Sequence, residues 1–456
     1  DTENLQPRME LAESVTPVDP LTWDVIVRDD VRFSDGTPVT AEDVAWTYLS
    51  VIKKGSDSPY QKNLAERFSS IEVRGPRTVR FHLVAPLATF LSDLDFGIVA
   101  KHAALPDDHF ANGTPVGAGP YRLGAHNLQR IELVANEFAS GDMKPRLPRV
   151  TIKIVVDAAA RALMLAGGSA DVVLNGVRLD LLDDVAQRPR VHVQTAPSLL
   201  LTYMLLNNED AILKDVRVRQ AIALALDRQA IVDGKFGGRA VLAAGLLPPT
   251  HWAFNAAMPR WGFDRARAMA LLDAAGYPDP DGAGPKPRLT LTYKTSSDAF
   301  RVSVARVIAE QLAQVGIAVD VMPFEFATFF VDIKKGQYQL ATMQTADITD
   351  PDFYFAYFHS SRIPTDKNRD GGNRWRYRNA EVDALTALGR AEPRLEARKA
   401  IYATVQAQIA NDVAIVPLWH EANVVVTNRR VHGFVMSPNA RLRGLIGVYK
   451  SDEATP

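Results

Sequence analysis

The first clear pattern of apolar and polar residues runs from Trp23 to Phe33, where apolar side chains recur mostly two positions apart. This spacing is typical of a half-buried strand. The pattern stops at an Asp-Gly turn, because Gly36 can adopt a positive φ at little cost. Thr40 can then cap a helix, and the carboxylate of Asp43, three residues on, can reach back to the cap. The stretch therefore predicts a strand, a turn and a capped helix with a structural role.

Patterns typical of strands and of helices alternate along the rest of the chain. Residues 199–208 are nearly all apolar, as expected for a strand buried on both faces. Residues 215–233 form one amphipathic helical pattern, which we expect to end at Gly234. This alternation predicts an α/β protein with mixed sheets. The other strand patterns are at 78–83, 150–157, 289–295, 317–324 and 414–427, and the other helical patterns are at 158–166, 263–277, 299–316, 381–391 and 395–412.

Composition places the chain among globular proteins of ordinary charge. Its 456 residues are enough for about two or three domains. The net charge is -1 at pH 7, so no basic excess favours binding to nucleic acid. The absence of cysteine excludes disulfides and thiol chemistry, and it fits an oxidising compartment. Asp1 opens the chain without the regions of a signal peptide, so we expect a cytosolic protein or one whose export signal has been removed.

Few patterns indicate catalysis, a cofactor or a metal. The glycines of 117–124 lack the spacing of a nucleotide-binding loop, and the histidines form no metal-binding pair at helical spacing. No cofactor and no metal site are therefore expected. Ser50 and Lys53 match the S-x-x-K pattern of serine acyltransferases, and Lys294, Thr295 and Ser296 loosely match its K-T-G partner, but the third element of that active site is missing. A serine hydrolase that uses these two residues is a distant alternative.

The segment richest in chemical groups is 343–361, which follows a strand pattern. It carries Asp347, Asp350 and Asp352, and a run of aromatic residues comes after them. A carboxylate beside aromatic rings can hold a cationic, partly apolar ligand. Asp350 and Asp352 flank Pro351 and are interpreted as turn and cap residues. The segment therefore predicts either a site for a cation or a solvated loop that precedes a buried helix face.

A series of specific blocks runs through the sequence in a fixed order. They are VRFSDGTPVTAEDVAWTYLSV, GAGPYRL, AGGSADVVLNG, DVRVRQAIALALDRQAIV, FDRARAMALLDAAGY, GQYQLATMQTADITDPD and RNAEVDAL. Together these blocks resemble the family 5 extracellular solute-binding proteins of ABC importers, which are periplasmic binders of dipeptides, oligopeptides and nickel complexes. The resemblance covers nearly the whole chain.

The resemblance implies a two-lobed periplasmic-binding-protein clamshell with mixed sheets and an additional accessory domain, in which a solute is captured between the lobes. The accessory domain would be 1–96, lobe I would be 97–198 plus 420–456, and lobe II would be 199–419. The protein would be a monomeric receptor, periplasmic or anchored outside the membrane, that delivers its solute to a membrane permease. It would not be an enzyme. Closure would follow from ligand contacts that exist only in the closed form.

The resemblance also implies where the ligand lies. In peptide-binding members an aspartate at the position of Asp347 pairs with the α-amino group of the ligand, so a peptide or peptide-like amine is expected. Members often place an aromatic wall just before this aspartate, where this chain has Met343, Gln344 and Thr345. Nickel chelates, opines and oligosaccharides are alternative ligands on the same fold. The other positions that match the cleft wall are Tyr203, Arg374 as a partner for a carboxylate, and Trp375 as a stacking surface.

Overall fold

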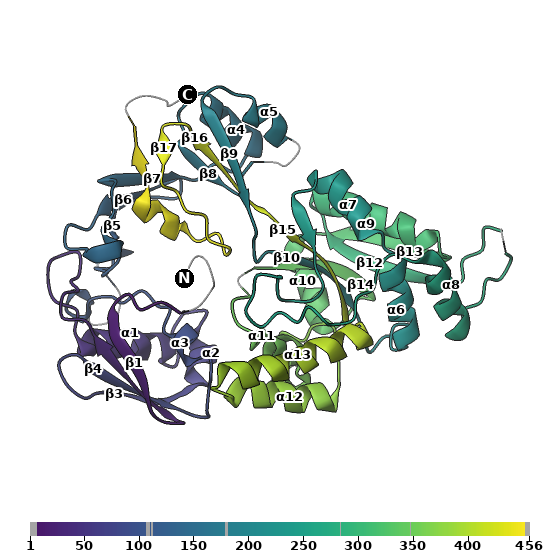
Figure 1. Cartoon of the computed structure of the whole chain (residues 1–456), viewed down its shortest axis with the longest axis horizontal. Helices are drawn as coiled ribbons and strands as arrows, with labels where there is room; N and C mark the ends of the chain where they lie inside the picture. The colour runs from purple at the N-terminus through teal and green to yellow at the C-terminus, as the bar shows by residue number, and fades with distance from the viewer. Residues whose placement is uncertain are drawn as a thin grey trace. The chain divides into compact units, whose positions relative to one another are not determined.

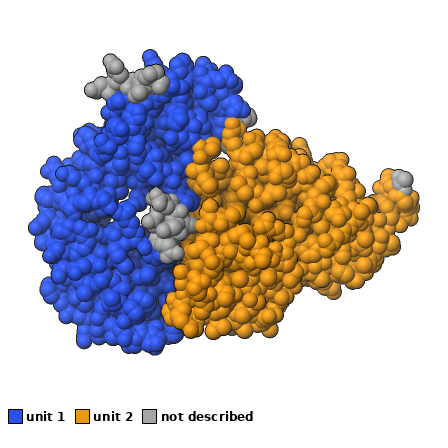
Figure 2. Space-filling view, in the orientation of Figure 1, with its two compact units in different colours: residues 1–194, 424–456 blue, residues 195–423 orange. Residues whose placement is uncertain are grey.

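The computed structural model forms two compact units (Figure 2). It describes residues 7–105, 110, 113–177, 181–282, 284–346 and 348–451. Among these residues no helix is both long enough and apolar enough to cross a bilayer. The predicted division into an accessory domain and two lobes is finer than this and stays a prediction. Unit 1 consists of Asp1–Gln194 and Val424–Pro456, and unit 2 consists of Thr195–Asn423.

The N-terminal part of unit 1 is an antiparallel sheet with the strand order β1-β2-β4-β3, and helix α1 packs on it (Figure 1). Tyr48 of α1 lies edge-on to Phe81 of β4, with ring centroids 5.2 Å apart. These rings belong to one apolar core that holds the helix on the sheet. The elements are β1 Ala12–Asp19, β2 Thr22–Val27, α1 Ala41–Ile52, α2 Gln61–Ala65, β3 Phe68–Val73, β4 Thr78–Leu83 and α3 Phe90–Asp93.

The predicted turn and helix cap before α1 are confirmed. Asp43 N donates to Thr40 Oγ1 at 3.3 Å, and Thr40 N donates to Asp43 Oδ2 at 3.0 Å. Gly36 has a φ of 88°, which glycine adopts more readily than other residues. The observed strand is shorter than the predicted one, which ran to Phe33, because β2 already ends at Val27. Beyond it, Arg32 makes only an isolated bridge to Pro38. Proline has no N–H to continue a ladder.

The remainder of unit 1 contains the sheets β5-β6-β7, β8-β16-β9 and β17-β18. Strand β16 comes from the C-terminal part of the chain and lies between two strands of the N-terminal part, which joins both parts in one unit. Val426 of β16 and Leu165 of α4 share an apolar core there. The elements are β5 Tyr121–His126, β6 Arg130–Ala135, β7 Arg149–Lys153, α4 Ala158–Ala166, β8 Val172–Leu174, α5 Leu182–Ala186, β9 Val191–Ala196, β16 Asn423–Asn428, β17 Val431–His432 and β18 Tyr449–Lys450.

Unit 2 is built on a six-stranded sheet with the order β11-β15-β10-β14-β12-β13 (Figure 1). Strand β12 runs parallel to β13 and β14, and the remaining neighbours are antiparallel. The predicted α/β architecture with mixed sheets is therefore confirmed. The strands are β10 Leu201–Leu206, β11 Ala240–Leu242, β12 Leu289–Ser296, β13 Ile317–Phe324, β14 Leu340–Thr345 and β15 Ile415–Glu421, and the helices are α6 Val216–Ala225, α7 Arg228–Phe236, α8 Arg265–Ala274, α9 Ala299–Ala313, α10 Phe326–Lys335, α11 Phe353–Phe358, α12 Ala380–Ala391 and α13 Leu395–Asp412.

Strand β10 lies in the middle of this sheet, and all its residues are buried, as its apolar run predicts. Leu201, Tyr203 and Leu205 face one side, where they share a core with residues of α10, α11, α12 and α13. Helices α7 and α9 contact the same sheet, α7 at β15 and α9 at β12 and β13. The sheet is thus covered by helices, which explains why its central strand has no polar alternation.

The single helix predicted for 215–233 is wrong. The chain forms α6 and α7 instead, with Leu226 in an extended conformation between them. Asp227 then starts the second helix, because its Oδ1 accepts a hydrogen bond from Ala230 N at 3.0 Å. Gly234 lies inside α7, and the helix ends at Gly237, whose φ is 55°. The amphipathic pattern hides this break because both helices bury apolar faces.

Candidate ligand-binding site

A polar cluster lies where strands β10, β14 and β15 of unit 2 run side by side. Thr202 Oγ1 donates to Glu421 Oε1 at 3.0 Å. Gln344 Nε2 donates to Thr202 Oγ1 at 2.9 Å and also to the same Glu421 oxygen. Arg301 of α9 completes the set by donating from Nη2 to Gln344 Oε1. We call these four residues the Glu421 cluster.

The Glu421 cluster holds a partly buried carboxylate. Burial raises the pKa of Glu421 above its usual range, while the charge of Arg301 and the hydrogen bonds from Thr202 and Gln344 oppose that rise. The side chains of Thr202 and Gln344 that donate to Glu421 Oε1 are neutral, so they do not neutralise its charge. A carboxylate of this kind can accept a ligand ammonium group, provided that hydrogen bonds complete the pair.

His420, the neighbour of Glu421 on β15, lies opposite Leu201 of β10 and Val241 of β11. It is 4% exposed, and neither ring nitrogen has a hydrogen-bond partner among the described residues. Burial lowers the pKa of His420 to about 4, because an imidazolium ion would lose its hydration there. The ring is therefore uncharged at neutral pH.

We expect His420 to make the protein less stable in acid. Its folded-state pKa of about 4 lies below the usual 6.5, so the unfolded chain binds a proton first and stability falls as pH drops below 6.5. The loss between about pH 7 and about pH 4.5 should be roughly 2–3 kcal/mol for this group. The measurement is urea unfolding of the protein and of His420→Leu at both pH values. Glu421, whose pKa is raised, acts in the opposite direction and is common to both proteins.

The His420→Leu variant should show a smaller loss of stability on acidification than the unchanged protein. His126→Gln provides the control, because His126 is exposed on β5 of unit 1. An equal acid dependence for the unchanged protein and His420→Leu would contradict the assignment of an uncharged, buried ring. If the stability of His126→Gln became equally insensitive to acidification, that result would also contradict the assignment of an uncharged, buried His420 ring.

On the other side of β14, aromatic side chains pack around Thr345. Thr345 Oγ1 and Tyr357 Oη are 2.9 Å apart and share a hydrogen bond. Trp375 lies edge-on to Tyr357 and to Tyr203, with ring centroids 5.7 Å and 5.8 Å apart. Met343 packs against the same core. The structure therefore brings four residues of the predicted site together, Met343, Thr345, Tyr203 and Trp375, while Gln344 faces the Glu421 cluster.

Tyr203 and Trp375 are core side chains in this structure, each 1% exposed. Burial raises the pKa of the Tyr203 hydroxyl. Trp375 Nε1 has no hydrogen-bond partner among the described residues. Their predicted role as ligand-facing residues stays a prediction, and what the structure adds is their packing against the end of β14.

Arg374 precedes this tryptophan and lies over an aromatic ring of α10. Its guanidinium carbon is 4.8 Å from the centroid of the Phe330 ring, a distance that allows a cation–π interaction. The carbonyl of Arg374 accepts a hydrogen bond from Tyr338 Oη at 2.8 Å. The Nε atom is buried without a partner among the described residues. The predicted contact of Arg374 with a ligand carboxylate stays a prediction.

Asp347, the predicted partner of a ligand amine, lies outside the described residues. Strand β14 ends at Thr345, two positions earlier in the sequence. A specific contact supports the interpretation of Asp350 as a structural residue. Both of its carboxylate oxygens accept hydrogen bonds from Arg398 of α13, at 2.5 Å and 2.9 Å. Asp352 comes directly before α11, as predicted for a cap position, although its side chain makes no capping hydrogen bond.

The sequence interpretation did not find Glu421, Arg301 or Thr202 as parts of this site, whereas Tyr357 lies in the aromatic run of the predicted segment 343–361. One signal was available for Glu421, because it is an acidic residue inside the long apolar pattern 414–427. Its partner Thr202 is 219 positions away in sequence. Only the pairing of β10 with β15 brings the two side chains together.

The residues of the distant hydrolase alternative make contacts that are typical of a structural role. Ser50 lies in the last turn of α1 in unit 1, and the backbone N–H of Lys53 caps that helix by donating to Leu49 O. Lys294 in unit 2, which loosely matches a second acyltransferase motif, pairs with Asp332 at 2.7 Å. These contacts are those of a helix end and an ion pair.

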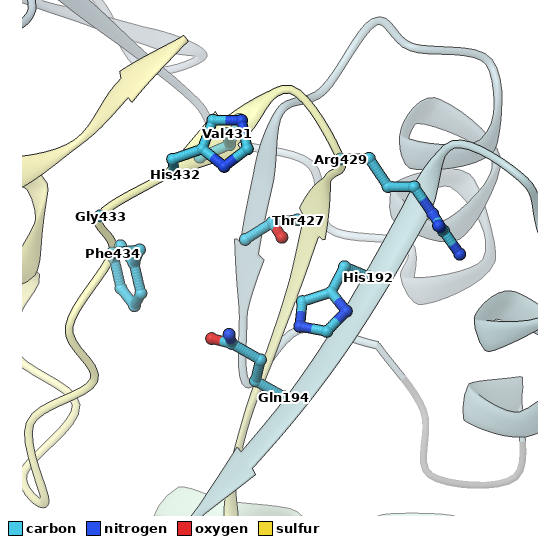
Figure 3. Close-up of a pocket in the computed structure, with 8 residues that line it drawn as sticks. All are labelled: His192, Gln194, Thr427, Arg429, Val431, His432, Gly433 and Phe434. Atoms are coloured by element: carbon cyan, nitrogen blue, oxygen red, sulfur yellow. The ribbon is translucent and has the colours of Figure 1, made fainter. Parts of the chain in front are cut away.

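Unit 1 contains a polar pocket of about 370 Å³ beside β9 and β16 (Figure 3). His432 at its edge contacts Ser451 Oγ at 3.1 Å through Nε2 and packs on the ring of Tyr449. In the described part of the chain, no group of three or more His, Cys, Asp or Glu side chains could hold a metal ion. The pocket is lined by His192, Gln194, Thr427, Arg429, Val431, His432, Gly433 and Phe434.

Comparison with known proteins identifies the family. Residues 6–365 match the family described as bacterial extracellular solute-binding proteins, family 5 Middle. This match covers well over half of the 456 residues. The chain belongs to this family. The resemblance recognised from the sequence blocks is thereby confirmed.

Relatives of this family 5 protein include two peptide-binding proteins. The probable D,D-dipeptide-binding periplasmic protein DdpA of Escherichia coli (strain K12) is 30% identical over an alignment 429 residues long, which covers 91% of this chain and 79% of DdpA. The oligopeptide-binding protein AppA of Bacillus subtilis (strain 168) is 27% identical over an alignment 463 residues long, which covers 96% of this chain and 83% of AppA. This chain is thus similar to proteins whose names state that they bind peptides.

Solved structures confirm the predicted two-lobed fold of a periplasmic binding protein. The structure of AppA from Bacillus subtilis in complex with a nonapeptide has a TM-score of 0.79 and 25% identity, and the match covers 99% of this chain and 92% of AppA. NikZ from Campylobacter jejuni in complex with Ni(L-His) has a TM-score of 0.83 and 25% identity, over 98% of this chain and 92% of NikZ. This family 5 fold therefore accommodates ligands of different chemistry.

Proposed function

We propose that this family 5 protein binds a short peptide or a peptide-like solute with a free amino group and delivers it to the membrane permease of an ABC importer. The relatives DdpA and AppA, named for dipeptides and oligopeptides, support this ligand class. The names of these relatives, a periplasmic binding protein and an oligopeptide-binding protein, also support a periplasmic location and a role in binding without enzymatic activity. We propose a monomer that needs no cofactor and no nucleic acid.

The observation that carries this proposal is the chemistry on the two sides of β14 at its end. On one side Gln344 donates to the partly buried carboxylate of Glu421. On the other side Thr345 shares a hydrogen bond with Tyr357 inside an aromatic cluster. Two positions further along the sequence stands Asp347. Carboxylates next to aromatic surfaces suit a ligand that joins an ammonium group to an apolar body, as a peptide does.

We expect a free-amino dipeptide to raise the melting temperature of the protein, because a ligand that binds only the folded form stabilises it by mass action. The probe is a set of dipeptides such as Ala-Phe, each compared with its N-acetylated form in calorimetry. Acetylation removes the ammonium charge and should weaken binding by at least about thirtyfold, as for one partner lost from a buried charge pair. Equal affinity for both forms would contradict the proposed amine contact.

A nickel chelate is the second candidate ligand. It is favoured by the similarity to NikZ, whose structure contains Ni(L-His). A chelated ion brings most of its ligands with it, so a protein without a three-ligand metal cluster in its described part could still hold one. Binding of the nickel–histidine complex with no response to any dipeptide would replace the peptide proposal. Binding of an opine or an oligosaccharide would be detected by the same calorimetric titration.

A further inference from the structure

Unit 2 contains a second cavity, separate from the Glu421 cluster, with a volume of about 230 Å³. Residues of helices α6, α7, α11 and α13, of strands β11 and β15 and of two loops of unit 2 line it, and apolar side chains predominate among them. The ones that matter here are Leu246, Met258, Phe358, Ile409 and the small Ala410. An apolar cavity of about 150 Å³ is large enough to hold benzene, so this one can hold a compact ring with a substituent.

One wall of the cavity is a guanidinium group without a counter-charge. Arg228 Nη1 donates to the carbonyls of Ala243 at 3.1 Å and Pro417 at 2.5 Å, and Nη2 donates to the carbonyl of Trp261 at 2.8 Å. All these acceptors are neutral, and among the described residues no carboxylate acts on the charge of Arg228. The other charged residue that lines the cavity is Arg260, which is also basic.

The charged form of Arg228 is therefore destabilised at this position. Burial lowers the pKa of the Arg228 guanidinium, with no neighbouring carboxylate to oppose the change. Arg228 is partly buried, so its charge has lost part of its hydration, and an anion placed beside it would offset that cost. Guanidinium groups bind carboxylates especially well, because their planar donors match the two carboxylate oxygens.

We propose that this cavity, which we call the Arg228 cavity, binds a small carboxylic acid with a compact apolar body, such as an aromatic monocarboxylate. The carboxylate is held by Arg228, and the apolar body lies among Leu246, Phe358 and Ile409. The site is formed within unit 2 and uses neither Asp347 nor the Glu421 cluster. It is therefore distinct from those two ligand contacts, although Phe358 also packs on Trp375, with ring centroids 4.9 Å apart.

The first test uses the whole protein and benzoate as the probe, with thermal unfolding and calorimetry as the measurements. Benzoate should raise the melting temperature, and benzamide and benzyl alcohol, which are similar in size but uncharged, should bind at least tenfold more weakly. Equal binding of the uncharged analogues would overturn the role of Arg228. No response to millimolar benzoate would overturn the site itself.

The second test uses variants. Ala410→Leu should fill the cavity and abolish the benzoate response while dipeptide binding is unchanged. Arg228→Gln should weaken benzoate binding at least tenfold, and Arg219→Gln is the matched control. Arg219 also donates to backbone carbonyls, including that of Leu213 at 2.8 Å, and does not line the cavity.

Each outcome with these variants supports or overturns benzoate binding in the Arg228 cavity. Unchanged benzoate affinity in Ala410→Leu would place the ligand elsewhere and overturn the proposal. The same loss in Arg219→Gln as in Arg228→Gln would show a general effect of removing a buried arginine, which also overturns it. If a variant does not fold, the comparison of benzoate with benzamide on the unchanged protein still decides.

Discussion

Asp347→Ala is expected to weaken the binding of a free-amino dipeptide by at least about thirtyfold, the loss typical when one partner of a desolvated charge pair is removed. The reason is electrostatic. An ammonium group that leaves water for a closed site is stable there only if a carboxylate and hydrogen bonds replace its hydration. Isothermal titration calorimetry of the variant and the unchanged protein, with the same peptide, measures the effect.

Two further variants make the Asp347 result specific. Asp347→Asn keeps the size of the side chain and removes its charge, so it should lose nearly as much affinity as Asp347→Ala. Asp366→Ala, which changes an exposed carboxylate in another loop, should leave affinity unchanged. Full affinity in Asp347→Ala together with a large loss in Glu421→Gln would transfer the role of amine partner to the Glu421 cluster.

Arg398→Met is expected to lower the free energy of unfolding by about 3–5 kcal/mol, because it leaves a buried carboxylate without its partner. Arg398 has a side-chain exposure of 6%, and that of Asp350 is 15%. The guanidinium donates to both oxygens of Asp350 and also to the carbonyl of Gly389 at 3.1 Å. The pair thereby ties α13 to the loop that follows β14. Urea unfolding of the variant measures the loss.

The control for Arg398 is another arginine on the surface of the same helical region. Arg394 pairs with Glu392 at 2.8 Å, but its side chain is 79% exposed, so Arg394→Met should cost no more than about 1 kcal/mol. Asp350→Asn should destabilise the protein as well, and the double variant should lose less than the sum of the two single changes. Additive effects in the double variant would contradict a direct pair.

These experiments separate two aspartates that stand three positions apart. Asp347 is predicted to act on ligand affinity, and Asp350 is predicted to act on stability. From sequence the two carboxylates differ little, since both lie in the polar segment TADITDPD. The proline beside Asp350 indicated a structural role for it, and the contact with Arg398 supplies the physical basis of that role.

Local signals in the sequence predicted most of the elements. The capping box of Thr40 and Asp43 needs residues three positions apart, so its hydrogen bonds depend little on the rest of the fold. The long helix α9 was expected to end at Gly316, and this glycine, with a φ of 85°, follows the helix end closely. The boundary between α6 and α7 was missed because Asp227 interrupts a hydrophobic pattern that remains intact on both sides of it.

The sequence by itself determined most of the elements, the family and the mixed α/β architecture, because helix capping, periodicity and the order of the blocks can be read along one chain. The tertiary structure alone decided which side chains meet. Thr202 and Glu421 are brought together by the pairing of β10 with β15, and Arg228 comes to line an apolar cavity through loops distant in sequence. Such contacts depend on strand order and helix packing, which short-range patterns do not encode.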